Sequence, residues 1–270
     1  MRRLLACLAL FALASTPAAQ ARDLSGFSAT QRAEIVRFAA NNSLFVLYHE
    51  LMHLLVHQLD VPVLGREEDA ADNMATWTLL SRKTGGSETT LTDAAHGWIL
   101  SGVAYNSTPD DEDLAAAHTL DRQRAFQIVC LMVGSDERAF RPIANQYAIS
   151  HDRQDSCAWD YTLLDRSFRH TLKPLAKGAG KTNVTISYQP PGRELKSAAE
   201  AFRASGVFEE VAEELRTRYA VRKPVRFNAQ RCDEANAFYD PDQLEIIFCY
   251  ELMDDFIALY ADELSSSQGR

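Results

Sequence analysis

The sequence lacks an excess of positive charge. Its 270 residues include 28 Lys and Arg against 37 Asp and Glu, which gives a formal net charge of -9. Binding to nucleic-acid phosphates or to an anionic membrane surface needs a concentrated basic patch. The composition therefore argues against both kinds of partner, and we expect no nucleic-acid partner.

Glycine and proline are scarce, and no segment is repeated. The chain has 12 Gly and 9 Pro, while 46% of its residues are hydrophobic and 24% are charged. These proportions exclude collagen-like, low-complexity and disordered chains and are typical of a globular protein. A folded chain of this length buries roughly 70–75% of its unfolded surface, which is enough to form a stable core.

Long apolar runs are absent. After the first residues, no stretch reaches the ~18 apolar residues that a transmembrane helix needs. The chain begins with two arginines, a short apolar run over Leu4–Ala14 and the small residues Ala19 and Ala21. This pattern is typical of a secretory signal peptide over residues 1–21. We therefore expect an exported protein, periplasmic or secreted, with no transmembrane segment.

Cysteine is infrequent, and no pair has the close spacing of a cysteine zinc site. One of the five cysteines, Cys7, lies in the predicted signal peptide. An even number in the rest of an exported chain predicts two disulfides, with buried free thiols as the alternative. Four cysteines allow three pairings, of which sequence proximity favours Cys130–Cys157 and Cys232–Cys249.

Hydrophobic periodicity and turn residues predict a mostly helical α+β protein. We expect helices over residues 28–40, 44–59, 66–81, 90–104, 120–133, 136–147, 156–172, 194–219 (with a break at Gly206) and 251–261. Strand-like segments follow at 182–188, 225–228 and 244–249, with a turn region between the last two. Residues 22–270 are expected to form a single domain, with an internal boundary or a loop near residues 173–193.

The most informative segment is His49-Glu50-Leu51-Met52-His53. On a helix, residues four apart lie on one face about 6 Å apart, so both imidazoles could reach one ion. Glu50 lies about 100° further around, where it could contact a metal-bound water without being a ligand. Burying three ionisable groups on an apolar helix costs free energy, which favours a functional role for them. The alternative interpretation is a pair of core histidines whose hydrogen bonds are satisfied. The segment predicts His49 and His53 as metal ligands and Glu50 as the general base.

A catalytic zinc site needs a third protein ligand and one open position. His57 follows His53 by four residues, but on a continuous helix it would lie about 12 Å along the axis from His49. The three-histidine metzincin pattern needs a Gly turn and a histidine six residues after His53, where this chain has Leu59. His57 is therefore the weaker candidate.

The stronger candidate for the third ligand is Glu68 in the helix over residues 66–81. Glu68 lies on the inward face beside small alanines, which would let a tight antiparallel helix pair bring it to the two histidines. Asp72, one turn later on the same face, suits a contact with the free N–H of a ligand histidine. Glu67 is the rival candidate for the third ligand. The acidic cluster has an alternative explanation, because negative charges in the first turn of a helix interact favourably with the helix dipole.

These motifs resemble those of gluzincin metallopeptidases, whose later Glu-x-x-Ala/Ser-Asp motif supplies the third ligand and a supporting Asp. Residues Glu68–Asp72 match that motif. More closely, the chain resembles a bacterial exported family of putative metallopeptidases of unknown function. The resemblance rests on FVLYHELMHLL, VPVLGREEDAAD, CLMVGSD, NAFYDP and CYEL. It covers nearly the whole mature chain and implies a zincin-like active-site helix pair. In familiar zincins strands precede the active-site helix, whereas here most strand-like sequence follows it, as a small C-terminal hairpin or sheet.

The NAFYDP block has a physical interpretation of its own. Cys232 and Cys249 flank a candidate hairpin, and a strand clamped near the metal could pair with an extended peptide. Tyr239 or Asn236 could donate a hydrogen bond to the oxyanion, and His96, Tyr105, His151 and Tyr161 are unranked alternatives. For the Asp and Pro of the block, we favour a role in building a turn.

Together these patterns predict a zinc-dependent metallohydrolase with one Zn²⁺ ion and a peptide or protein substrate. Zinc-activated water would attack the amide, with Glu50 as general base. One alternative is a catalytically inactive, metal-stabilised binding or inhibitory protein. Another is a hydrolase of cell-wall amides, which the same chemistry permits.

Overall fold

The computed structural model describes residues 23–105, 108–176 and 182–268, so the predicted signal peptide lies outside the described residues. The helices are α1 (Ala29–Leu59), α2 (Glu67–Arg82), α3 (Gly85–Ala104), α4 (Asp111–Ala115), α5 (Asp121–Ser135), α6 (Glu137–Gln146), α7 (His151–Leu175), α8 (Lys196–Ser205), α9 (Val207–Arg218) and α10 (Tyr250–Gln268). The strands are β1 (Val184–Tyr188), β2 (Val225–Gln230), β3 (Ala237–Asp240) and β4 (Glu245–Cys249). The protein is therefore mostly helical with a small C-terminal sheet, as the sequence predicts.

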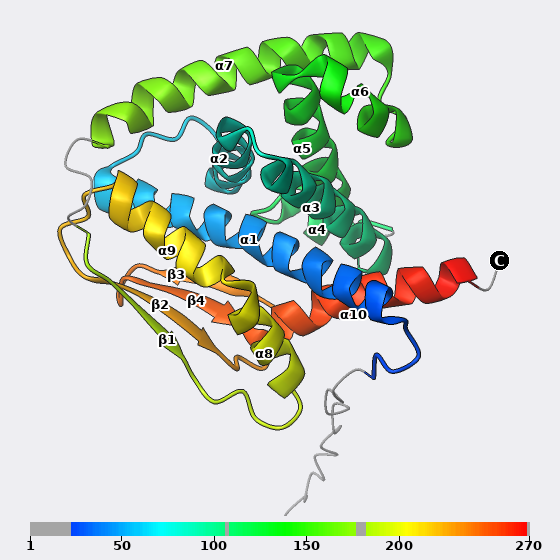
Figure 1. Cartoon of the computed structure of the whole chain (residues 1–270). Helices are drawn as coiled ribbons and strands as arrows, with labels where there is room; N and C mark the ends of the chain where they lie inside the picture. The colour runs from blue at the N-terminus through cyan, green and yellow to red at the C-terminus, as the bar shows by residue number, and fades with distance from the viewer. Residues whose placement is uncertain (1–22, 106–107, 177–181, 269–270) are drawn as a thin grey trace, which may run out of the picture.

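Helix α1 runs through the middle of the molecule, with α2, α3 and α5 on one side and α8, α9 and the sheet on the other (Figure 1). From residue 38 to residue 55 it is buried nearly all round, and Phe38, Leu47 and Leu51 have no exposed surface. A helix with this pattern is stable only when neighbours cover every face. Both layers therefore pack on α1, and their apolar side chains share one hydrophobic core.

The predicted break between the helices over residues 28–40 and 44–59 is wrong, because α1 continues through Asn41 and Asn42. The Asn42 amide donates to the carbonyl oxygens of Phe38 (2.9 Å) and Asp93 (3.1 Å). Asn41 donates to the Asp93 carboxylate at 2.6 Å. Both amides thus gain partners in α1 and α3 instead of competing with the helical backbone. On α3, Gly97 faces Asn42 so closely that a Cβ there would lie 1.9 Å from the Asn42 Oδ1.

Several helix boundaries differ from those expected, because polar residues cap the helices earlier than the apolar periodicity begins. Helix α3 begins at Gly85, and the Thr84 hydroxyl accepts a hydrogen bond from its first turn. Helix α7 begins at His151, where Ser150 acts in the same way. The break at Gly206 is confirmed, and this residue has a φ of 70° between α8 and α9. Across the described residues, every helix is too short or too polar to span a lipid bilayer.

The sheet has the order β1-β2-β4-β3. Strands β1, β2 and β4 are parallel, and β3 pairs antiparallel with β4 as a hairpin. Residues 237–240 lie within the expected turn region and form β3, so the hairpin predicted between Cys232 and Cys249 is present, and its turn begins after β3. There the Asp240 Oδ1 accepts hydrogen bonds from the backbone of Asp242 and Gln243. Strand β3 is an edge strand, and it packs against α1.

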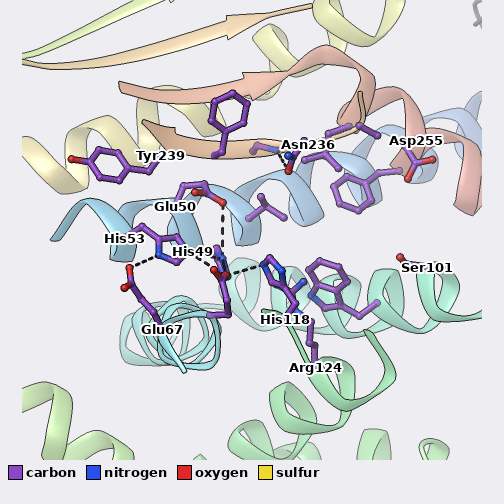
Figure 2. Close-up of a pocket in the computed structure, with 18 of the residues that line it drawn as sticks. His49, Glu50, His53, Glu67, Ser101, His118, Arg124, Asn236, Tyr239 and Asp255 are labelled. Carbon is purple, nitrogen blue, oxygen red and sulfur yellow. Dashed lines mark hydrogen bonds and ion pairs between the residues drawn. The ribbon is translucent and has the colours of Figure 1, made fainter. Parts of the chain in front are cut away.

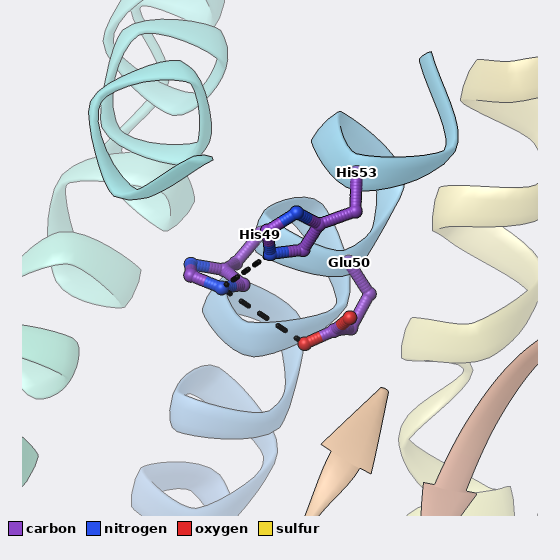
Figure 3. A group of neighbouring side chains, drawn as sticks. All are labelled: His49, Glu50 and His53. Atoms are coloured by element: carbon purple, nitrogen blue, oxygen red, sulfur yellow. Dashed lines mark hydrogen bonds and ion pairs between the residues drawn. The ribbon is translucent and has the colours of Figure 1, made fainter. Parts of the chain in front are cut away.

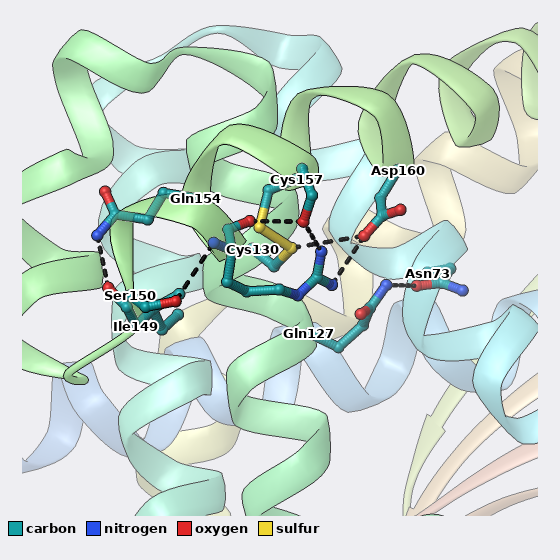
Figure 4. Close-up of a disulfide and its surroundings, with 10 residues drawn as sticks. Asn73, Gln127, Cys130, Ile149, Ser150, Gln154, Cys157 and Asp160 are labelled. Atoms are coloured by element: carbon teal, nitrogen blue, oxygen red, sulfur yellow. Dashed lines mark hydrogen bonds and ion pairs between the residues drawn. A yellow bond between two sulfur atoms is a disulfide. The ribbon is translucent and has the colours of Figure 1, made fainter.

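Two disulfides cross-link the chain in the pairing that sequence proximity favours. Cys130 of α5 is bonded to Cys157 of α7, which joins these two packed helices (Figure 4). Cys232 is bonded to Cys249 and ties the segment before β3 to the end of β4. Closing loops of this size stabilises a fold by roughly 3 kcal/mol each, mainly by restricting the unfolded chain.

Replacement of Gly97 by Ala tests the close approach of α1 and α3. Gly97→Ala is expected to lower the free energy of unfolding by about 1–3 kcal/mol, because the added methyl group overlaps the buried Asn42 amide. Urea denaturation followed by circular dichroism measures the change. Gly86→Ala is the matched control in the same helix, since its added Cβ would come no closer than 3.9 Å to a neighbour. Equal stability of the two variants would contradict the packing described.

Candidate metal centre

His49 and His53 lie one turn apart on the same face of α1 (Figure 3). Their Nε2 atoms are 3.1 Å apart, and their ring centroids are 4.8 Å apart. His49 is buried, and His53 is partly exposed toward a cavity. The local cause is the helical repeat, which places residues four apart above one another.

Glu68 approaches the same point from the first turn of α2. Its Oε2 is 3.1 Å from the His49 Nε2 and 3.3 Å from the His53 Nε2. Tetrahedral zinc with bonds of about 2.0–2.1 Å places neighbouring ligand atoms about 3.3 Å apart. The three atoms therefore have the spacing and the chemistry to hold one zinc-sized ion.

The expected antiparallel pairing of the two helices is wrong. Figures 1 and 2 both show α2 end on beside α1, so that it crosses α1 steeply. The crossing brings the first turn of α2, which carries Glu67 and Glu68, to the histidines. The rest of α2 is then free to pack against α3, α5 and α7. The small residues Ala71 and Ala75 are fully buried and permit the close approach.

Asp72 lies one turn beyond Glu68 and is buried beneath His49. The His49 Nδ1 is 2.8 Å from the Asp72 Oδ1. An ionised carboxylate can only accept, so this nitrogen carries a proton, and in the neutral ring the Nε2 lone pair is then available to a metal. Burial by itself lowers the pKa of His49, but the hydrogen bonds to Asp72 and Glu68 outweigh it and raise the pKa to about 9 in the metal-free protein.

Arg124 of α5 holds Asp72 in its ionised form. Its Nε lies 2.7 Å from one carboxylate oxygen and its Nη2 lies 2.8 Å from the other. The guanidinium also stacks on the Trp98 ring, 3.6 Å from the centroid. Burial by itself would raise the pKa of Asp72, but the charge and hydrogen bonds of Arg124, with His49, hold it well below its usual range. Sequence reasoning missed Arg124, because nothing links it by spacing to the motifs on α1 and α2.

Glu67 contacts the opposite side of His53 from Glu68. Its Oε1 is 2.7 Å from the His53 Nδ1, so it orients the ring through the nitrogen that faces away from the His49 Nε2. The structure thus brings both candidate carboxylates to the site but places only Glu68 at the shared point. The hydrogen bonds that Glu68 accepts from His118, His49 and His53 hold its pKa far below the usual range.

Glu50 is buried on the other side of the histidine pair. Its Oε1 lies 4.0 Å from the His49 Nε2. Burial is the main reason that its pKa is raised, and the charges of His49 and His53 oppose that effect. The backbone N–H of Tyr239 on β3 donates a hydrogen bond to the carboxylate. The sheet therefore orients Glu50, while the helical layer orients the histidines.

His118 is a second residue that sequence reasoning missed. It comes from the connection between α4 and α5, and its Nε2 is 2.8 Å from the Glu68 Oε2. Its ring lies 5.9 Å from the His49 ring, with the planes inclined by 21°. A histidine in a loop has no periodic relation to the motif, so only its proximity in the fold identifies it.

A cavity of about 820 Å³ opens beside these residues (Figure 2). This volume is within the usual range for a ligand site. Its apolar lining includes Val46, Trp98, Leu252 and Phe256. Residues 235–239 form another part of the wall, so the edge strand β3 borders the cavity opposite α2.

The predicted oxyanion donors Asn236 and Tyr239 both line this cavity. The Tyr239 hydroxyl is 2.8 Å from the His57 Nδ1, and Figure 2 shows it on the side away from Glu50. The Asn236 Oδ1 accepts a hydrogen bond from the backbone of Ala237, which fixes the side-chain amide at the start of β3. His57 contacts Tyr239 rather than the other histidines.

Removal of the Arg124 guanidinium tests its role in the buried cluster. Arg124→Leu is expected to lower the free energy of unfolding by about 3–5 kcal/mol, because the buried Asp72 carboxylate then loses its bidentate arginine partner and keeps only His49. Chemical denaturation of the metal-free protein measures the effect. Arg169→Leu removes an exposed ion pair with Asp165 and is expected to cost no more than about 1 kcal/mol. Similar losses in the free energy of unfolding for the two variants would contradict the proposed stabilisation of Asp72 by Arg124.

Comparison with known proteins identifies the family of the chain. A family model described as "Putative metallopeptidase" matches residues 13–172 and 188–269. No curated protein and no solved structure gives a significant match. The match to the family model covers most of the chain and includes every residue of the site described above. The chain therefore belongs to this family, described as "Putative metallopeptidase".

Proposed function

We propose that the protein is a zinc-dependent peptidase in which His49, His53 and Glu68 hold one zinc ion. The observation that carries the proposal is the meeting of these three ligand atoms at 3.1–3.3 Å from one another. A buried carboxylate, Glu50, lies beside them, and the cavity next to them is large enough for part of a peptide. The family to which the chain belongs supports metal-dependent peptide hydrolysis.

Glu50 is the proposed general base. When bound, zinc supplies a Lewis acid that polarises the substrate carbonyl and makes water more acidic. Glu50 accepts the proton of the attacking water and passes it to the leaving amine. Its burial raises its pKa, which makes the carboxylate a stronger base, and the Tyr239 N–H contacts the carboxylate from β3.

The surrounding residues position the proposed ligands. Asp72 fixes the tautomer and orientation of His49, and Arg124 keeps Asp72 charged. Glu67 orients His53 through its contact with the His53 Nδ1. Such contacts reduce the freedom of a ligand before the ion binds and raise its basicity.

The edge strand β3 is the proposed docking site for an extended peptide. It pairs with β4 on one side only, and its other side borders the cavity. The N–H groups of Ala237 and Tyr239 already donate to Asn236 and Glu50. A substrate strand would therefore rely on the β3 carbonyl groups and on the apolar cavity wall.

The two alternative functions, an inactive binding protein and a hydrolase of cell-wall amides, differ from a peptidase in the residues or the substrates that they require. An inactive binding protein would not need the buried carboxylate of Glu50, whose burial is costly. A hydrolase of cell-wall amides would use the same groups, and its substrates separate it from a peptidase. We also propose that the protein is exported, which its two disulfides support.

Replacement of Glu50 by Gln tests the proposed base. Glu50→Gln is expected to lower kcat for a quenched fluorescent peptide library by about 10²–10⁴-fold, because the amide cannot accept the proton. Elemental analysis is expected to find zinc in this variant as in the wild type, whereas His53→Ala is expected to lose both zinc and activity. Full activity of Glu50→Gln would remove Glu50 from the mechanism, and zinc retained fully by His53→Ala would contradict the ligand set.

The two predicted oxyanion donors can be separated by mutation. Because the Tyr239 hydroxyl is already engaged by His57, we propose Asn236 as the donor. Asn236→Ala is expected to lower kcat by about 10²–10³-fold with little change in KM, since such a donor acts mainly in the transition state. Tyr239→Phe is the matched control and is expected to have a smaller effect. The reverse order of effects would assign the role to Tyr239.

A further inference from the structure

His118 occupies a place in the site that the proposed function does not use. Its Nε2 is directed at the Glu68 Oε2, the same oxygen that faces the Nε2 atoms of His49 and His53. The ligand atoms of His49, Glu68 and His118 all lie within 4.8 Å of one another. Four candidate ligand atoms thus converge on one region, whereas a catalytic zinc site uses three protein ligands.

We propose that His118 is a fourth, displaceable ligand of the metal ion, which closes the site at rest and leaves when a substrate enters. The proposal rests on the proposed function, because it assumes that His49, His53 and Glu68 hold zinc. Three imidazoles and one carboxylate are a chemically suitable donor set for tetrahedral zinc. With His118 bound, the position needed by the attacking water is filled.

The surroundings of His118 fit a ligand that can leave. About half of its side chain is exposed, whereas His49 is only 4% exposed and His53 16%. His118 lies outside the regular helices, after the short helix α4, and residues 114–118 are exposed. Thr119 tethers the segment to α2 through a 3.3 Å hydrogen bond to Asp69. His49 and His53, by contrast, lie on the central helix, and Asp72 and Glu67 hold their second nitrogens.

The position of His118 also relates the site to the substrate cavity. His118 lines the same cavity as Glu50 and the edge strand β3. A peptide carbonyl that reaches the metal must take the place of one ligand or of solvent. The exposed, loop-borne His118 is easier to displace than the two buried or braced helical histidines. The loop between α4 and α5 would therefore control access to the metal.

Zinc X-ray absorption spectroscopy tests the proposal without an activity assay, because imidazole rings give countable outer-shell scattering. The zinc-loaded wild type is expected to show three imidazoles and His118→Ala two. His57→Ala is the matched control: it removes another cavity histidine and is expected to keep three. Thermal unfolding of the metal-free variants checks that they are folded. We expect both to fold, because the side chains of His57 and His118 are exposed.

Acetohydroxamate, a small bidentate zinc ligand, tests displacement. Its addition to the zinc-loaded wild type is expected to lower the count from three imidazoles to two, and to leave His118→Ala at two. Two imidazoles in the untreated wild type would overturn the proposal and leave the proposed function intact. Three imidazoles that persist with acetohydroxamate would overturn displacement and favour a closed, non-catalytic site. A wild type that binds no zinc would overturn the proposed function itself.

Discussion

The buried contact between Asp72 and His49, supported by Arg124, is the interaction on which the site depends. It links α1, α2 and α5 through charged groups that have left water. Such groups are tolerated in a core only when each has a well-placed partner. The bidentate guanidinium and the imidazole satisfy both carboxylate oxygens, and the stacked Trp98 covers the guanidinium. The cluster therefore sets the rotation of His49 before any ion binds.

The central position of α1 explains how one short segment can serve two layers of the fold. The histidines face α2 and α5, which supply carboxylates and the supporting arginine. Glu50, one residue after His49, faces the sheet instead and accepts a hydrogen bond from the backbone of β3. The proposed ligands and the proposed base are thus held by different parts of the protein. The cavity lies between these parts, where a peptide could contact both.

The parts of the structure that follow local rules could be predicted from the sequence. The spacing of His49 and His53 follows the helical repeat, and the acidic motif of α2 places Glu68 and Asp72 one turn apart. The helical class, the Gly206 break and the cysteine proximity are likewise local features. Predictions failed where a distant residue changed a local preference. Asn42 does not end a helix, because the backbone of α3 accepts its amide, and α2 crosses α1 because several helices share its apolar face.

The sequence by itself determined which chemical groups could bind a metal, because ligand spacing on one helix or in one motif depends on backbone geometry alone. Only the tertiary structure decided what surrounds them. Arg124, His118 and the backbone N–H of Tyr239 reach the site from a later helix, a loop and an edge strand. Their positions follow from how the helical layer and the sheet pack on α1, and a contact between segments far apart in the chain leaves no periodic signal in a single sequence.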